Sequence, residues 1–247
     1  MSLRVLSDTD RQSKLADDQS KILTQLDGVS KKFAGASHNA LEDINLEVFQ
    51  KDFLSIVGPS GCGKTSLLKM MCGLIKPTSG KIDWPTSNFQ NSPENPANLS
   101  YVFQEPNLLP WMNVYENIKL PLKIVKEDTY SADEKIYEII NLVGLQGFEG
   151  YYPRQLSGGM SMRVSIARAL VTQPKVLLMD EPFSALDETR RFELSQEILK
   201  IKKEKNLTVV YVTHSIYESV YLSDRIYVMQ PNPCLLYTSD AADEERG

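Results

Sequence analysis

Long hydrophobic runs are missing from this 247-residue sequence, and so are dense blocks of basic residues. No apolar run approaches the ~20 residues that a membrane-spanning helix needs. The net charge of −5 gives no indication of nucleic-acid binding. Residues 1–25 are polar and charged, unlike a secretory signal peptide. We therefore expect a protein of the cytosol.

Cysteine is also scarce. Of the three cysteines, Cys234 lies in the C-terminal tail. The other two, Cys62 and Cys72, are too few and too oddly placed for a disulfide framework. The rest of the composition, 42% hydrophobic and 24% charged, is ordinary for a soluble globular protein. The length allows one large domain or two small ones.

Hydrophobic periodicity predicts alternating strands and helices after a flexible, polar lead-in at residues 1–20. One expected strand begins at Ile22. The others span 41–49, 53–57, 99–103, 176–179, 208–212 and 226–229. One expected helix follows 53–57 and ends near Cys72, and residues 113–147 are expected to be mostly helical. Further helices are expected at 158–171, 188–205 and 216–222, and a loop at 85–98. This alternation predicts an α/β fold with a largely parallel sheet. The helix-rich block between Gln104 and Leu156 interrupts it and is a candidate inserted helical subdomain.

The stretch Gly58–Thr65 fits the phosphate-loop pattern G-x-x-x-x-G-K-[ST] at every fixed position. A predicted strand precedes it and a predicted helix follows it, so a chance glycine loop is the weaker alternative. Main-chain N–H groups and the helix N-terminus would surround phosphate oxygens. Lys64 would reach the β- and γ-phosphates, and the Thr65 hydroxyl would hold Mg²⁺. The predicted nucleotide-binding residues here are Gly58, Pro59, Ser60, Gly61, Cys62, Gly63, Lys64, Thr65 and Ser66, with Cys62 a small filler.

Two acids follow the apolar strand at 176–179. That strand would deliver Asp180 beside the Mg²⁺ site, where a carboxylate can hold the metal or its water. Glu181 would lie next to it, where it can orient or deprotonate a water that attacks the γ-phosphate. The alternative is an ordinary acidic start of a helix.

A third motif, Leu156-Ser157-Gly158-Gly159-Met160, makes the chain resemble the ATP-binding subunits of ABC transporters. The resemblance covers about residues 22–230, and its motifs occur in the family's order. These are the phosphate loop, Gln104, the Leu-Ser-Gly-Gly signature, Asp180-Glu181, Ser184-Ala185-Leu186-Asp187 and His214. The resemblance implies a P-loop NTPase (RecA-like) core, an antiparallel β subdomain and a helical subdomain at about 105–170, within an ATPase domain at 21–233.

The resemblance also implies a site shared between two subunits. Ser157, Gly158 and Gly159 would meet the γ-phosphate held by the other subunit, with a hydroxyl, N–H groups and a helix N-terminus. Two ATP molecules would then join two copies head to tail, with Asp187 at their seam. Met162 stands where many relatives have Gln, which removes one possible hydrogen bond near that seam.

Three further roles follow from the resemblance. His214 would contact the γ-phosphate, although in isolation an ordinary surface histidine is the simpler interpretation. Gln104 would reach Mg²⁺ or the attacking water. Phe33 would stack on adenine; tyrosine is commoner at that position, and a core or surface phenylalanine is the alternative.

The runs 102–111 and 152–160 are similar to the nitrate/sulfonate/taurine branch of importers. Such a subunit would drive import of a small solute, an anion or a vitamin precursor, from the cytoplasmic face of the plasma membrane. Its partners would be a separate transmembrane permease and, indirectly, a solute-binding protein. The alternatives are a non-transport ABC ATPase acting in DNA repair or translation, and a regulatory nucleotide-binding protein without turnover.

The segment Gln104–Leu122 is the predicted docking surface for the permease. Directly after Gln104 it carries an apolar cluster, which can mark a partner surface; ordinary core is the alternative. The members of the cluster are Pro106, Leu108, Leu109, Pro110 and Trp111.

The tail at 234–247 resembles a translated sequencing adapter, the end of a transposase recognition sequence with its primer extension. We therefore expect the gene fragment to be cut near Pro233, with its natural C-terminus missing; a genuine Asp-rich tail is the alternative. Pro231 and Pro233 disfavour a continuing helix or central strand, so we expect the tail to add nothing to the fold.

Overall fold

The structure, a computed structural model, describes residues 22–84, 98–126, 130–230 and 235–239. One of its two sheets is antiparallel, with the strand order β2-β1-β4. Its strands are β1 (Ile22–Lys31), β2 (Leu41–Phe49) and β4 (Ser79–Asp83). The expected antiparallel part of the fold is therefore confirmed. In β2, Leu41, Ile44, Leu46 and Val48 are buried, as their spacing predicted.

The other sheet has the order β5-β6-β7-β3-β8-β9 and is parallel except for its last strand. Because parallel strands end at one edge, the segments that follow β3, β5, β6 and β7 converge there. These segments carry the candidate site. The strands are β3 (Phe53–Val57), β5 (Leu99–Val102), β6 (Val176–Asp180), β7 (Thr208–Thr213), β8 (Arg225–Gln230) and β9 (Leu235–Ser239).

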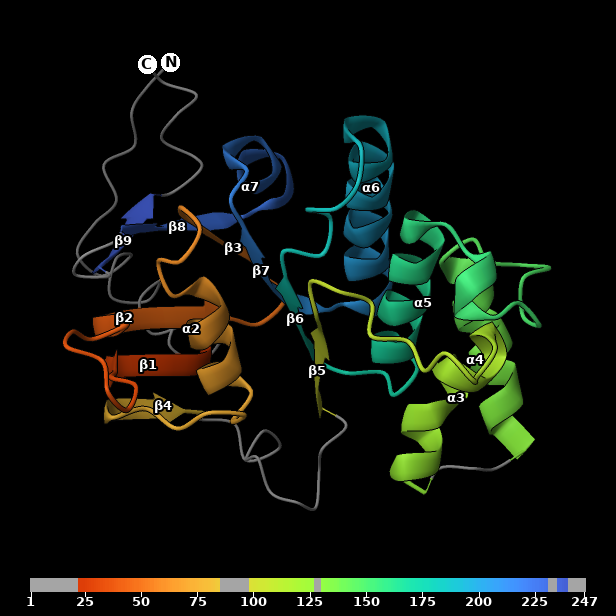
Figure 1. Cartoon of the computed structure of the whole chain (residues 1–247), viewed down its shortest axis with the longest axis horizontal. Coiled ribbons are helices and arrows are strands. Elements are labelled where there is room, and N and C mark those ends of the chain that lie inside the picture. The colour runs from red at the N-terminus through yellow and green to blue at the C-terminus, as the bar shows by residue number, and fades with distance from the viewer. Residues whose placement is uncertain (1–21, 85–97, 127–129, 231–234, 240–247) are drawn as a thin grey trace, which may run out of the picture.

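Helices cover both faces of the parallel sheet (Figure 1). On β6, Leu178 faces the core that holds α2 and the antiparallel sheet, whereas Leu177 and Met179 face the core that holds α3 to α6. This two-sided burial explains why the strand is continuously apolar. The helices are α2 (Lys64–Met71), α3 (Val114–Ile124), α4 (Tyr130–Leu142), α5 (Gly158–Leu170), α6 (Glu188–Lys205) and α7 (Ile216–Leu222).

The helices α3, α4 and α5 pack together at one end of the molecule (Figure 1). They follow β5 and precede β6 in the chain, where the sequence predicted an inserted block. The proposed division into a helical subdomain at 105–170 within a domain at 21–233 stays an interpretation. The lead-in at 1–20 lies outside the described residues, as does nearly all of the predicted loop at 85–98.

Two strands were not expected from the sequence. The first is β4, whose first residue, Ser79, pairs with Ser30 of β1. Gly80 allows this approach, since a Cβ there would lie 2.3 Å from the Gly28 carbonyl oxygen. Its φ of +80° also favours glycine.

The prediction that the tail adds nothing to the fold is wrong for Leu235–Ser239. This segment forms β9 and pairs antiparallel with β8, from Ile226 opposite Ser239 to Gln230 opposite Leu235. A sheet edge offers unpaired N–H and C=O groups, and pairing with them requires main chain rather than a particular sequence. The adapter origin of the tail stays a prediction, because a strand of foreign origin can pair in the same way.

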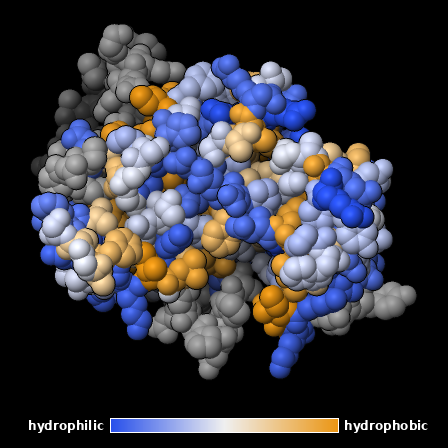
Figure 2. Space-filling model, in the orientation of Figure 1, coloured by the Kyte–Doolittle hydropathy of each residue, from blue (hydrophilic) through white to orange (hydrophobic). Residues whose placement is uncertain are grey.

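Hydrophilic residues cover most of the face shown in Figure 2, and apolar residues form small separate patches on it. Among the residues that the structure describes, every helix is too short or too polar to cross a bilayer.

Candidate active site

The phosphate loop joins the end of β3 to α2. Two of its glycines are required by close contacts: a Cβ on Gly58 would lie 2.5 Å from the Met229 carbonyl oxygen, and one on Gly63 would lie 2.9 Å from that of Ala40. Pro59, Ser60 and Gly61 are exposed, so their main chain is accessible. The Cys62 side chain is buried among apolar residues, in agreement with its predicted role as a filler.

Lys64 is the first residue of α2, and its side chain is only 4% exposed. Its Nζ donates to the carbonyl oxygens of Gly58, at 2.8 Å, and Pro59, at 3.0 Å. It also forms an ion pair with Glu181 Oε1 at 3.3 Å. The ammonium group therefore lies inside the curve of the loop, where a phosphate-binding lysine is needed.

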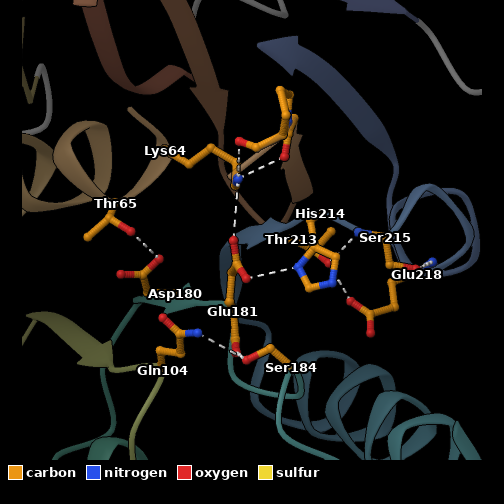
Figure 3. A network of polar contacts seen from close by, with 12 residues as sticks. Lys64, Thr65, Gln104, Asp180, Glu181, Ser184, Thr213, His214, Ser215 and Glu218 are labelled. Atoms are coloured by element: carbon orange, nitrogen blue, oxygen red, sulfur yellow. Dashed lines mark hydrogen bonds and ion pairs between the residues drawn. The ribbon is translucent and has the colours of Figure 1, made fainter. Parts of the chain in front are cut away.

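Thr65 and Asp180 meet directly, although 115 residues separate them in the chain. The Thr65 hydroxyl donates to Asp180 Oδ1 at 2.9 Å (Figure 3). Mg²⁺ prefers hard oxygen ligands and takes few of them from the protein when phosphates supply others. A hydroxyl beside a carboxylate, next to a phosphate loop, fits that requirement.

Glu181 follows β6 in a left-handed main-chain conformation, with a φ of +43°. Its N–H donates to the Val212 carbonyl oxygen at 2.9 Å, which ties it to β7. Its carboxylate contacts Lys64 through Oε1 and His214 Nδ1, at 2.9 Å, through Oε2 (Figure 3). Non-glycine residues with positive φ often lie at functional sites, where neighbouring contacts hold the strained geometry.

Gln104 lies just past the end of β5 and belongs to the same group of side chains (Figure 3). Its Nε2 donates to Ser184 Oγ at 3.3 Å, and that hydroxyl donates to the Glu181 carbonyl oxygen at 2.9 Å. The structure thus brings together Lys64, Thr65, Gln104, Asp180, Glu181 and His214, all of which the sequence predicted for this site.

A buried acid contacts Thr213, the residue before His214, and was not predicted. Glu218 of α7 is 5% exposed and accepts hydrogen bonds from Tyr211, at 2.8 Å, and Thr213, at 2.6 Å. Its other oxygen forms an ion pair with Arg191 of α6 at 3.2 Å. Burial and then the Glu218 charge raise the pKa of Tyr211 well above its usual value, so the phenol stays a donor. Nothing in the local sequence distinguishes Glu218 from an ordinary surface acid of a short helix.

The signature motif lies apart from this network. Ser157 caps α5, accepting from the Met160 N–H at 3.3 Å, and Gly158 and Gly159 form the first turn. The helix α5 packs on the face of the sheet opposite α2. Met162 is buried in that core, so it contributes packing rather than a contact at the surface.

The two remaining predicted residues lie at the ends of other elements. Asp187 caps α6, and its Oδ1 accepts from the Arg190 N–H at 3.0 Å. Phe33 follows β1 and is 43% exposed, with Lys31 Nζ 5.4 Å from its ring centroid. Its loop closes where Ala40 donates to the Lys31 carbonyl, and Ala40 also touches the phosphate loop. The ring is thus partly exposed rather than buried in the core.

Two further residues fix the loop that follows Gln104, and the sequence analysis missed both. The buried amide of Asn117 accepts from the Leu109 N–H at 2.9 Å and donates to the Met112 carbonyl at 2.9 Å. Arg168 of α5 donates to the carbonyls of Pro106 and Asn107. Leu108 packs against the core, whereas Trp111 is 68% exposed. The predicted docking cluster is therefore partly core and partly surface.

Two grooves border α7. One, of about 450 Å³, is lined by Gly58, Pro59 and His214 and thus opens beside the network. A larger one, of about 810 Å³, lies between α6 and α7 and is lined by Phe192, Tyr217 and Tyr221. The lining of both grooves lacks Lys64, Thr65, Asp180 and Glu181, so the site is defined by its polar contacts, and the smaller groove borders it only at Gly58, Pro59 and His214.

Comparisons with known proteins agree with this geometry. The ABC transporter family profile matches residues 41–184. An ABC transporter ATP-binding protein of Methanocaldococcus jannaschii is 43% identical over 218 residues, 87% of this chain and 80% of the relative. The aliphatic sulfonates import ATP-binding protein SsuB of Bacillus cereus is 43% identical over 84% of this chain and 81% of its own. The taurine import ATP-binding protein TauB of Pelagibacter ubique is 40% identical, and the match covers 86% of this chain and 79% of TauB.

Among solved structures, the dimeric ATP-binding cassette MJ0796 bound to ADP and Pi is similar, with a TM-score of 0.77 and 31% identity. The match covers 88% of this chain and 98% of that one. The predicted fold is thereby confirmed. The chain therefore belongs to the ABC transporter family, as an ATP-binding subunit similar to those of the sulfonate and taurine importers.

Proposed function

We propose that this chain is the ATP-hydrolysing subunit of an importer: two copies close around two ATP molecules and drive a small solute through a separate permease. One observation carries the proposal. Two neighbouring sets of polar contacts join the phosphate loop to the end of β6: Thr65 donates to Asp180, and Lys64 pairs with Glu181, which also contacts His214. A binding protein without turnover would not need the last two residues beside the lysine.

Within this proposal, the ammonium group of Lys64 and the N–H groups of the loop bind the phosphates. Thr65 and Asp180 would hold Mg²⁺, which when bound neutralises phosphate charge and orients the terminal group. Gln104 would take part in the same metal or water contacts. Thr65 contacts Asp180 directly, and Gln104 is linked through Ser184 to the main chain of Glu181, the residue after Asp180.

Glu181 is the proposed general base for the attacking water. Its carboxylate projects toward Lys64, and thus toward the place where a γ-phosphate would bind. His214 shares the other carboxylate oxygen, so it can contact the same phosphate and hold Glu181 in place. Phe33 would stack on adenine from the loop that touches the phosphate loop.

The shared site requires a second copy of the chain. In one chain, α2 and the signature helix α5 pack on opposite faces of the sheet. The signature of a chain therefore lies away from its own phosphate loop, which supports the proposal that a second copy completes each ATP site. Ser157, Gly158 and Gly159 would supply that partner's contacts, and Asp187 would lie at the seam. MJ0796, which is similar in sequence and fold, is described as a dimer.

Import is favoured over the DNA-repair or translation alternative because the relatives that cover most of this chain include import ATP-binding proteins for sulfonates and taurine. A spermidine/putrescine import protein of Fusobacterium nucleatum is 44% identical, although the match spans only 54% of its length. We infer a peripheral position at the cytoplasmic face of the membrane, beside a permease that receives solute from a binding protein. A small anion is the substrate class we propose.

The test is a steady-state ATPase assay on the purified chain and on the chain reconstituted with the permease encoded beside its gene. The parent should hydrolyse ATP in the presence of Mg²⁺, and Lys64→Ala should lose about 10²-fold or more of the rate, because the phosphate loses its main cation. Stimulation by the permease with bound solute would support import. A parent that binds ATP but never hydrolyses it, alone or assembled, would contradict the proposal.

A further inference from the structure

Tyr101 of β5 contacts the predicted metal-binding carboxylate at the oxygen that Thr65 does not contact. Its hydroxyl donates to Asp180 Oδ2 at 3.0 Å. The sheet register explains the contact: Tyr101 pairs with Leu178, and Leu178 and Asp180 project from the same face of β6 because they are two residues apart. The two side chains thus lie on one face of two neighbouring strands.

Asp180 is 4% exposed, and both of its oxygens accept from hydroxyl groups. Thr65 donates to Oδ1 and Tyr101 to Oδ2. A buried carboxylate needs such donors, because water cannot replace them. The two donors differ in their other tasks. Thr65 is itself a proposed metal ligand and must share its oxygen with the ion, whereas Tyr101 has no such task.

Tyr101 is also a rigid donor. Its ring lies 4.5 Å, centroid to centroid, from that of Phe103 and packs against the core below α2.

We propose that Tyr101 is a positioning residue for Mg²⁺: by holding Oδ2 of Asp180, it keeps Oδ1 directed toward Thr65, where the ion would bind. This rests on the proposed function of the site. Groups that orient a ligand typically change metal affinity 10–100-fold when they are removed. The role belongs to the hydroxyl alone, so it can be removed without changing the ring.

The test is Tyr101→Phe, with Mn²⁺ as a paramagnetic probe in place of Mg²⁺. We expect the Kd for Mn²⁺, measured by electron paramagnetic resonance with a saturating non-hydrolysable ATP analogue, to rise about 10-fold. Nucleotide affinity in EDTA should stay unchanged, since Tyr101 would not touch the phosphates. The matched control is Tyr115→Phe, which also removes a tyrosine–aspartate hydrogen bond, to Asp133 in the helical region. It should leave both affinities unchanged.

The outcomes separate this proposal from the function on which it rests. A Mn²⁺ Kd within about twofold of the parent's would overturn the role of Tyr101 while leaving the ATPase proposal intact. Equal loss of nucleotide affinity in EDTA would also overturn it, because the hydroxyl would then support the whole loop rather than the metal. If the parent itself binds no Mn²⁺ with the nucleotide, the proposed function fails. Tyr101→Met, which keeps an apolar side chain of similar length, should behave like Tyr101→Phe.

Discussion

Glu181 is engaged on both carboxylate oxygens, by Lys64 on one side and His214 on the other. This arrangement has a cost for nucleotide binding. A γ-phosphate that approaches Lys64 competes with the Glu181 carboxylate for the same ammonium group, and the two anions repel each other. The residue proposed to activate water therefore also weakens the affinity for ATP.

Replacing Glu181 by Gln should accordingly tighten ATP binding. We expect the Kd for a non-hydrolysable analogue to fall about two- to fivefold, the equivalent of roughly 0.5–1 kcal/mol, because the Lys64 ammonium group is freed and the repulsion of the γ-phosphate is removed. Calorimetry on the parent and variant measures it directly. Glu188→Gln, at the exposed start of α6, is the control and should leave the Kd unchanged. Weaker binding by Glu181→Gln would mean that the carboxylate assists the nucleotide rather than competing with it.

At the scale of elements, the loop between Gln104 and α3 depends on Asn117. This amide is fully buried and makes hydrogen bonds to Leu109, Met112 and Asn113. Asn117→Ala should lower the free energy of unfolding by about 2–3 kcal/mol, because several main-chain groups of the loop lose a partner. Denaturant titration measures the loss. Glu105→Ala, an exposed change on the same loop, should stay within about 0.5 kcal/mol of the parent, and equal effects would contradict this role.

That loop presents Trp111, 68% exposed, to solvent. If it is an anchor for the permease, Trp111→Ala should lower assembly and the stimulated ATPase rate of the reconstituted transporter, since large aromatic anchors often supply 2 kcal/mol or more, roughly 30-fold in affinity. The basal rate and melting temperature of the isolated subunit should not change. Tyr137→Ala, another exposed aromatic, at 55%, is the matched control. Unchanged assembly by Trp111→Ala would place docking elsewhere.

Some helices and strands could be predicted from the sequence, and others could not. The bounds of α6 and α7 agree with prediction because local signals mark them: Asp187 and Ser215 cap their first turns, and the apolar positions Leu194, Ile198 and Ile201 of α6 are buried. The strands β4 and β9 were missed because edge pairing depends on main-chain groups of a distant strand. No local pattern records that.

The residues of the site also fall into a predicted group and a missed group. Lys64, Asp180 and Glu181 were predicted because each lies in a local pattern that reflects its chemistry, whereas His214 was predicted from the resemblance to the family. Tyr101 was missed because its partner lies 79 residues away, and only the register of β5 on β6 brings the two together. Glu218 was missed for a similar reason, since its contacts to Tyr211 and Arg191 require α6, α7 and β7 to be packed.

At the scale of the whole molecule, the phosphate loop and the signature helix pack on opposite faces of one sheet. A second copy in head-to-tail orientation would bring its Ser157 and Gly159 to the ATP held by Lys64 and Thr65. The central claim is that ATP joins two subunits and that hydrolysis, through Glu181, releases them. Binding that favours only the dimer shifts the equilibrium toward it.

The most direct measurement is size-exclusion chromatography of Glu181→Gln with and without saturating Mg-ATP. Gln is nearly isosteric but a poor base, so hydrolysis should fall about 10²–10⁴-fold while binding persists. The variant should elute as a dimer only with ATP, where the parent elutes mostly as a monomer. Adding Ser157→Arg should abolish the dimer, because it places bulk at the seam. A Glu181→Gln protein that binds ATP normally and stays monomeric would contradict the shared-site account.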